Sequence, residues 1–105
     1  MEDIRIVRCR VGRPPEITHI PNDLHAMQRE VGGMIEAVPL MSGYRLVCDE
    51  EGKLKGKPIN LYLNHEDFIA GDFFWTKVKD EDFVSLSAAE ACNIASIMTH
   101  GGKIT

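Results

Sequence analysis

One stretch of this chain, residues 22–40, constrains the fold more than any other, because it holds a helix start, a helix stop and the beginning of a strand. Asn22 follows a proline and is a good N-cap, so we expect the helix to begin there. The predicted apolar stripe of this helix consists of Leu24, Met27 and Val31, at i, i+3 and i+7, with Gln28 beside it. The pair Gly32-Gly33 ends the helix, since glycine readily takes positive φ.

Short apolar runs separated by turn signals make up most of the remaining chain. Strands are predicted over residues 4–11, 16–20, 34–38, 44–48, 72–78 and 83–86, and residues 59–63 form either a short strand or one irregular turn. Ser87 and Glu90 form a capping box that opens a second helix, which runs to about Thr99 and ends at Gly101-Gly102. We therefore expect one α+β domain over residues 1–105, with a mainly antiparallel sheet of four to six strands and two helices.

Composition narrows the classes of function. The net charge of −4 argues against binding of a nucleic acid polymer, with a local exception in the arginines near the start of the chain, Arg5, Arg8, Arg10 and Arg13. The alternative for these arginines is a solvated strand face. No apolar run is long enough to span a bilayer and no charged-then-apolar leader opens the chain, so we expect no membrane association.

The cysteines and histidines give no sign of a disulfide framework or a metal site. Three widely spaced cysteines, Cys9, Cys48 and Cys92, favour a reducing cytosol, with each thiol as a small buried hydrophobe. The four histidines lack any metal-ligand spacing, and residues 49–52 resemble only half a calcium loop, so a solvated hairpin loop is favoured there. The chain also lacks a P-loop, a G-x-G-x-x-G and a G-x-S-x-G motif, and we expect no cofactor and no catalytic residues.

Polar residues set in apolar surroundings are the candidates for ligand binding. Glu36, Asn60 and Asp72 need partners if they are buried, and in one cleft with Gln28, Tyr44 and Trp75 they would suit a small polar ligand. Arg8, with Arg5 or Arg10 as alternatives, is the candidate phosphate partner. The competing interpretation places Glu36 and Asp72 on solvent faces, Asn60 at a turn and Trp75 in the core.

Four segments together resemble a known family. They are N-D-L-x-x-M-Q-x-x-V-G-G-M-I-E-A-V-P-L, residues 46–53, residues 57–60 and residues 69–74. The chain resembles short proteins of phages, plasmids and other mobile elements known only as a domain of unknown function, with Leu24, Gln28, Gly32, Gly33, Glu36, Asn60 and Gly71 as its signature.

The resemblance implies a phage accessory or counter-defence factor in the host bacterial cytosol. Such a factor would bind and sequester a cyclic nucleotide or cyclic ADP-ribose type of immune signal without catalysis, as a homo-oligomer. Two alternatives stay open. One is a protein-interaction module that inhibits a host protein through its acidic surface. The other is a nucleotide-degrading enzyme that uses Glu36 or Asp72 as general base.

Overall fold

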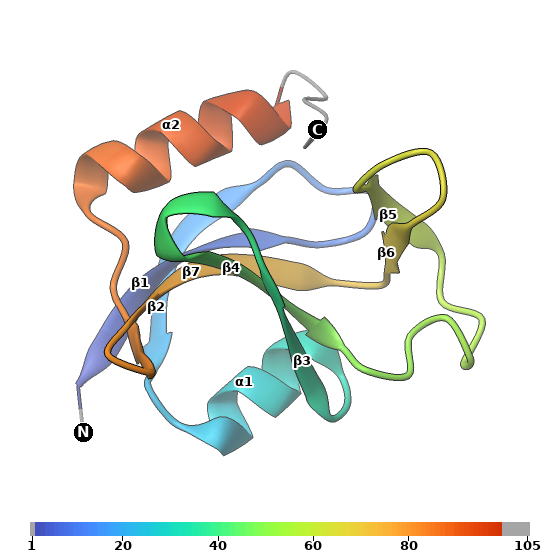
Figure 1. The fold of residues 1–105 in the computed structure, drawn as a ribbon, viewed down its shortest axis with the longest axis horizontal. Helices are drawn as coiled ribbons and strands as arrows, with labels where there is room; N and C mark the ends of the chain where they lie inside the picture. Colours follow the sequence, from blue (N-terminus) through green and yellow to red (C-terminus); the bar gives the residue numbers. More distant parts are fainter. Residues whose placement is uncertain (1, 100–105) are drawn as a thin grey trace.

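The computed structural model describes residues 2–99 as an α+β domain with two helices and eight strands in two sheets (Figure 1). The strands are β1 (Asp3–Cys9), β2 (Glu16–Pro21), β3 (Ile35–Pro39), β4 (Tyr44–Asp49), β5 (Ile59–Tyr62), β6 (Phe68–Ala70), β7 (Phe73–Lys79) and β8 (Asp82–Val84). The two α-helices are α1 (Leu24–Val31) and α2 (Ala88–Thr99), and a short 3-10 helix, η1 (Met41–Gly43), lies between β3 and β4. The predicted fold class is confirmed.

The main sheet has six antiparallel strands in the order β2-β1-β7-β4-β3, with β8 paired to β7. The two predicted hairpins, β1–β2 and β3–β4, are both present, and β7 lies in the centre as expected. The separate β5–β6 pair is not foreseen from the sequence. It exists because Gly71, at φ +90°, breaks the apolar segment 68–78 into two strands.

Each face of the main sheet carries its own core, and the side chains of β7 alternate between them. Phe74 packs with Ile6, Met27 and Val47 under α1. Trp75, its neighbour along the strand, packs on the opposite face. The buried members of that second core include Val7, Leu46, Trp75, Leu86, Ala91 and Ile94, the last two from α2. Figure 1 shows α1 on one side of the sheet, with α2 and the β5–β6 pair on the other.

The start of α1 differs from the prediction by one residue. Asp23 is the N-cap, and its Oδ1 accepts a hydrogen bond of 2.7 Å from the N–H of Ala26. Asn22 instead donates from Nδ2 to the carbonyl of Phe83, which ties the helix entry to β8. Leu24 is 52% exposed, so its predicted place in the apolar stripe is wrong, and Ala26 is buried with Met27 and Val31.

The capping box of α2 is confirmed by two reciprocal hydrogen bonds. The N–H of Glu90 donates to Ser87 Oγ over 3.0 Å, and the N–H of Ser87 donates to Glu90 Oε1 over 2.8 Å. Glu90 also accepts from Tyr44 and Lys77, so the start of α2 is fastened to β4 and β7. The predicted stop at Gly101-Gly102 lies outside the described residues.

Candidate functional site

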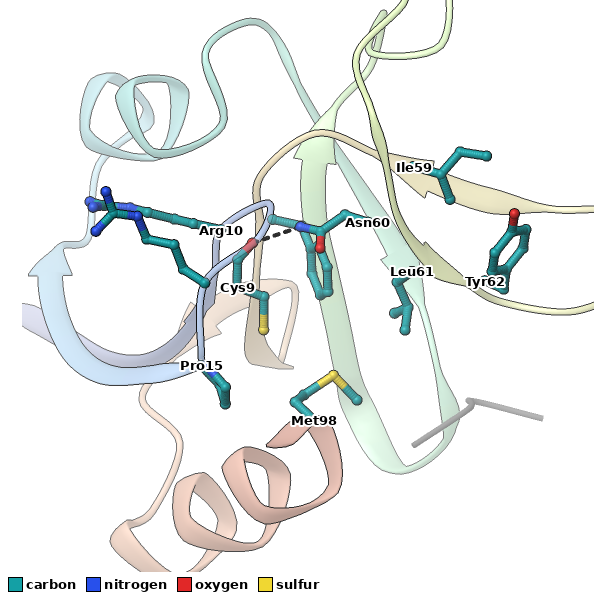
Figure 2. A pocket seen from close by; sticks show the side chains of 10 residues that line it. Cys9, Arg10, Pro15, Ile59, Asn60, Leu61, Tyr62 and Met98 are labelled. Carbon is teal, nitrogen blue, oxygen red and sulfur yellow. Dashed lines mark hydrogen bonds between the residues drawn. The ribbon is translucent and has the colours of Figure 1, made fainter. Parts of the chain in front are cut away.

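An open cavity of about 280 Å³ lies where the β1–β2 turn, β5 and the end of α2 meet (Figure 2). Its surface is largely apolar, and its polar side-chain groups are two guanidinium groups, one carboxamide, one phenol hydroxyl and one thiol. The lining residues are Cys9, Arg10, Arg13, Pro15, Ile59, Asn60, Leu61, Tyr62, Phe73 and Met98. This combination of an apolar body and a few polar groups is typical of a small-molecule site.

Asn60 holds one wall of the cavity in place. Its Nδ2 donates to the carbonyl of Cys9 over 3.0 Å and to the carbonyl of Gly71 over 2.9 Å. The first bond joins β5 to the end of β1, and the second joins it to the bend between β6 and β7. Asn60, which the sequence analysis singled out for its apolar neighbours, therefore both lines the cavity and joins β5 to β1 and to the bend before β7.

A second hollow of about 340 Å³ shares Arg10 and Arg13 with the first and adds Arg29, Glu30 and Asp72. In Figure 2 the Arg10 side chain runs from the first cavity away from Asn60. The two arginines therefore stand between an apolar cavity and a polar hollow. A ligand could place an uncharged ring on one side of them and an anionic group on the other.

Asp72 orders the turn that carries these arginines. Its Oδ1 accepts a hydrogen bond of 2.9 Å from the N–H of Val11, and the N–H of Arg13 closes the turn on the carbonyl of Arg10 over 3.1 Å. None of Arg10, Arg13 and Arg29 forms an ion pair with a carboxylate of residues 2–99. Their guanidinium donors are thus open to an anion.

Arg8, the predicted phosphate partner, is already engaged. Its guanidinium donates twice to Glu30, over 2.8 and 2.6 Å, in a bidentate pair that ties α1 to β1, and it also lies 3.5 Å from Glu16. Arg5 donates to the carbonyl of Leu86 over 3.0 Å. Arg10 is the one of the three sequence candidates that lines a cavity with open donors.

The other predicted ligand residues do not converge on one cleft. Asn60 lines the apolar cavity, Asp72 the polar hollow, and Glu36 a third cavity of about 260 Å³ that is lined by residues of β3, β4 and β6. Gln28 donates to the sulfur of Met34 on the protein surface. The structure therefore does not bring this set together in one cleft, because its members lie on different strands and loops.

The two aromatic candidates, Tyr44 and Trp75, belong to the core and its rim. Their rings meet edge to face, with centroids 6.2 Å apart, and Trp75 is 7% exposed. Tyr44 donates its hydroxyl to Glu90 over 2.9 Å, and burial together with this bond raises its pKa. Neither ring lines the cavity near Arg10.

Two further cavities have acidic linings. The one beside Glu36 includes Asp49, Glu50 and Asp67 with a single lysine, Lys53, and one of about 470 Å³ near α1 includes Asp23, Glu81 and Asp82. Because carboxylates outnumber cations in both linings, an anionic ligand is disfavoured there. The cavity pair at Arg10 and Arg13 is therefore the better candidate for an anion.

Sequence reasoning missed Tyr62, Leu61, Met98 and Arg13 as cavity residues. Tyr62 is 55% exposed and lies on the two-stranded β5–β6 sheet. The sequence periodicity did not predict this sheet. The available signal was the pair of arginines flanking the Val11-Gly12 turn, directly before two prolines. Met98 is half-buried on α2 and packs against the core on that face of the sheet.

Two signature residues, Gly32 and Gly33, lie beside a charged cluster of Asp49, Lys55 and Lys57, here called the latch, in which the Asp49 side chain is completely buried. Its Oδ2 lies 2.7 Å from both Lys55 Nζ and Lys57 Nζ, and Lys57 also donates to the carbonyl of Val31 at the end of α1. Burial alone would raise the pKa of Asp49, but these hydrogen bonds outweigh it and lower that pKa to about 2.

Gly32 and Gly33 make room for this latch. Gly32, at φ +77°, caps α1 by donating to the carbonyl of Gln28. A Cβ on Gly33 would lie 2.7 Å from the carboxylate of Asp49 and from Lys55 Nζ. The two glycines thus allow the latch to pack closely against the end of α1.

The thiols are poor nucleophiles where they line cavities. Burial raises the pKa of Cys9 to about 12 and that of Cys48 to about 11. Cys92 is exposed on α2, so its predicted burial is wrong.

Within residues 2–99 no three His, Cys, Asp or Glu side chains gather in a way that could hold a metal ion. No helix in the same range is long and apolar enough to cross a membrane.

The fold and the cavity together define a small α+β domain with an open, arginine-flanked surface site. The family model described as domain of unknown function DUF3846 matches residues 4–99, and the chain belongs to that family. Searches of curated proteins and of solved structures find no match.

Proposed function

We propose that this protein binds a small anionic ligand with a flat ring, of nucleotide type, in the cavity flanked by Arg10 and Arg13, and that it does so without changing the ligand. The observation that carries the proposal is the position of these two arginines between an apolar cavity and a polar hollow. The ring of the ligand would occupy the apolar cavity beside Tyr62 and Met98. Its phosphate would face the guanidinium groups.

The charge distribution favours an anion here despite the overall charge of −4. Arg10, Arg13 and Arg29 face the hollow, whereas its two carboxylates already have partners: Glu30 pairs with Arg8, and Asp72 accepts from Val11. Open guanidinium groups beside satisfied carboxylates leave a locally positive site. Guanidinium binds phosphate oxygens through two parallel hydrogen bonds.

The size of the cavity limits the ligand. Drug-sized sites span about 300–1,000 Å³, so a cavity of about 280 Å³ suits one base. The sugar and phosphate would extend over the arginines into the neighbouring hollow.

The biological role that we propose is sequestration of a nucleotide immune signal by a phage-borne counter-defence protein. Its support is the sequence resemblance to proteins of mobile elements, together with a site that has binding groups and whose one thiol, Cys9, is buried. Sequestration requires affinity and a preformed pocket and needs no general base. Glu36 is exposed on β3 and Asp72 is hydrogen-bonded to backbone, which fits this assignment better than a catalytic one.

A ligand panel tests the proposal. Purified protein is incubated with mononucleotides, cyclic nucleotides and cyclic ADP-ribose isomers, and its thermal unfolding is followed. The protein is then denatured and the released molecule is identified by mass spectrometry. We expect a stabilised protein and an unchanged ligand. A chemically altered molecule would make the protein an enzyme, and the absence of any shift would favour a protein partner.

A further inference from the structure

The carboxamide of Asn60 has a fixed orientation. A carboxamide nitrogen has two hydrogens, and both are used, by the carbonyls of Cys9 and Gly71. Because both partners are acceptors, the nitrogen and oxygen of this amide cannot exchange places without losing two hydrogen bonds. The two backbone contacts therefore hold Oδ1 in one direction.

That oxygen is open to the cavity. In Figure 2 the nitrogen of Asn60 faces Cys9, and its oxygen is turned toward the side of the cavity that holds Leu61 and Met98. Within residues 2–99 no group donates a hydrogen bond to Asn60 Oδ1, since both bonds of this side chain are made by Nδ2. The one buried side-chain nitrogen or oxygen without a partner in that range is Trp75 Nε1, so Asn60 Oδ1 is accessible. A carboxamide oxygen accepts hydrogen bonds and cannot donate.

Resting on the proposed function, we infer that the site selects a nucleotide whose base carries an exocyclic amine, of adenine or cytosine type, which donates to Asn60 Oδ1. The surrounding side chains, Leu61, Tyr62, Phe73 and Met98, contact the base through apolar atoms and add no competing carboxylate. A base that turns a carbonyl toward Asn60 would bring two acceptors together. A site built around one fixed acceptor discriminates strongly against a ligand that lacks the donor.

The test varies the ligand rather than Asn60, because substitution of Asn60 would also break its two backbone contacts. Two pairs of probes differ only in the amine. One pair is adenosine 5′-monophosphate and purine riboside 5′-monophosphate, and the other is cytidine 5′-monophosphate and its 4-deamino analogue. Dissociation constants are measured by calorimetry on the wild-type protein at fixed salt.

We expect the amine-bearing member of at least one pair to bind about tenfold or more tightly than its partner, the usual effect of one lost hydrogen bond at an acceptor that the bound ligand covers. Equal affinity within each pair that binds, or tighter binding of the member without the amine, would overturn the inference while leaving the proposed function in place. Binding of no probe, together with no shift in the wider panel, would remove both.

Discussion

The carboxylate of Asp49 lies 2.7 Å from the ammonium of Lys57, which in turn donates over 2.9 Å to the carbonyl of Val31. This contact joins the last residue of β4 to the last turn of α1 through a side chain from the loop before β5. A cation there also complements the negative end of the helix dipole. The latch thus fixes α1, β4 and the chain leading to the cavity relative to one another.

Replacement of Asp49 by Asn tests the latch. The change keeps the shape of the side chain but leaves two lysines without their anion, and Lys57 is only 25% exposed. We expect a loss of about 2–3 kcal/mol in the free energy of unfolding, as for hydrogen bonds to charged groups. Urea denaturation measures it. Asp67→Asn is the matched control, because its pair with Lys53 is about half exposed and should contribute less than about 1 kcal/mol.

Gly33→Ala tests the close approach of the backbone to the latch. A Cβ at this position would meet the Asp49 carboxylate and Lys55 Nζ at 2.7 Å, so the pair must shift apart. We expect a loss of about 1–3 kcal/mol, which is typical of overpacking. Gly56→Ala is the control, since a Cβ there meets nothing within 4 Å. Gly56 has φ +71°, so the control costs about 1 kcal/mol from backbone strain alone. Stability of Gly33→Ala equal to wild type would contradict the packing argument.

The pH dependence of stability reports the carboxylate that caps α2. The hydrogen bond from Lys77, followed by that from the N–H of Ser87, lowers the pKa of Glu90 from its ordinary 4.5 to about 2. A depressed folded-state pKa stabilises the protein above the unfolded pKa, and this contribution disappears as the pH falls through the folded value. The stability gap between wild type and Glu90→Gln should therefore be constant above about pH 5. It should shrink steadily toward pH 2. A gap independent of pH would contradict the assignment.

Two aromatic substitutions separate core from cavity. Trp75→Ala empties a buried site under α2 and should destabilise the protein by about 3–5 kcal/mol. Tyr62 is 55% exposed at the cavity. Its replacement by Ala should change the free energy of unfolding by less than about 1 kcal/mol and weaken ligand binding. Thermal unfolding and calorimetry of both variants check this. The reverse pattern would place the ligand at Trp75.

The sequence predicted the fold correctly wherever a feature depends on residues close together in the chain. The capping box at Ser87 and Glu90, the stop at Gly32 and the two hairpins follow from short-range chemistry, and all are present. The choice of Asp23 over Asn22 as N-cap was not predictable, because both side chains can cap and the contact of Asn22 with β8 is long-range.

The candidate site was less predictable, because its residues come from segments far apart in the chain. Asn60 was identified from its apolar neighbours, yet its partners at Cys9 and Gly71 lie 51 and 11 residues away. Trp75 and Tyr44 were candidates for the ligand site by residue type alone, but Trp75 is buried in the core that lies under α2. Tyr62 could be recognised only once β5 was known to lie outside the main sheet.

The central claim is that Arg10 and Arg13 hold the anionic group of a nucleotide-type ligand. The most direct measurement compares calorimetric affinity for the best ligand of the panel between Arg10→Ala/Arg13→Ala and the charge-matched control Arg45→Ala/Lys79→Ala, whose residues line no part of the site. We predict a loss of about 100-fold or more for the first variant, from hydrogen bonds to charged groups. The control should bind like wild type, and both variants should stay folded. Equal affinity of the two variants would contradict the claim.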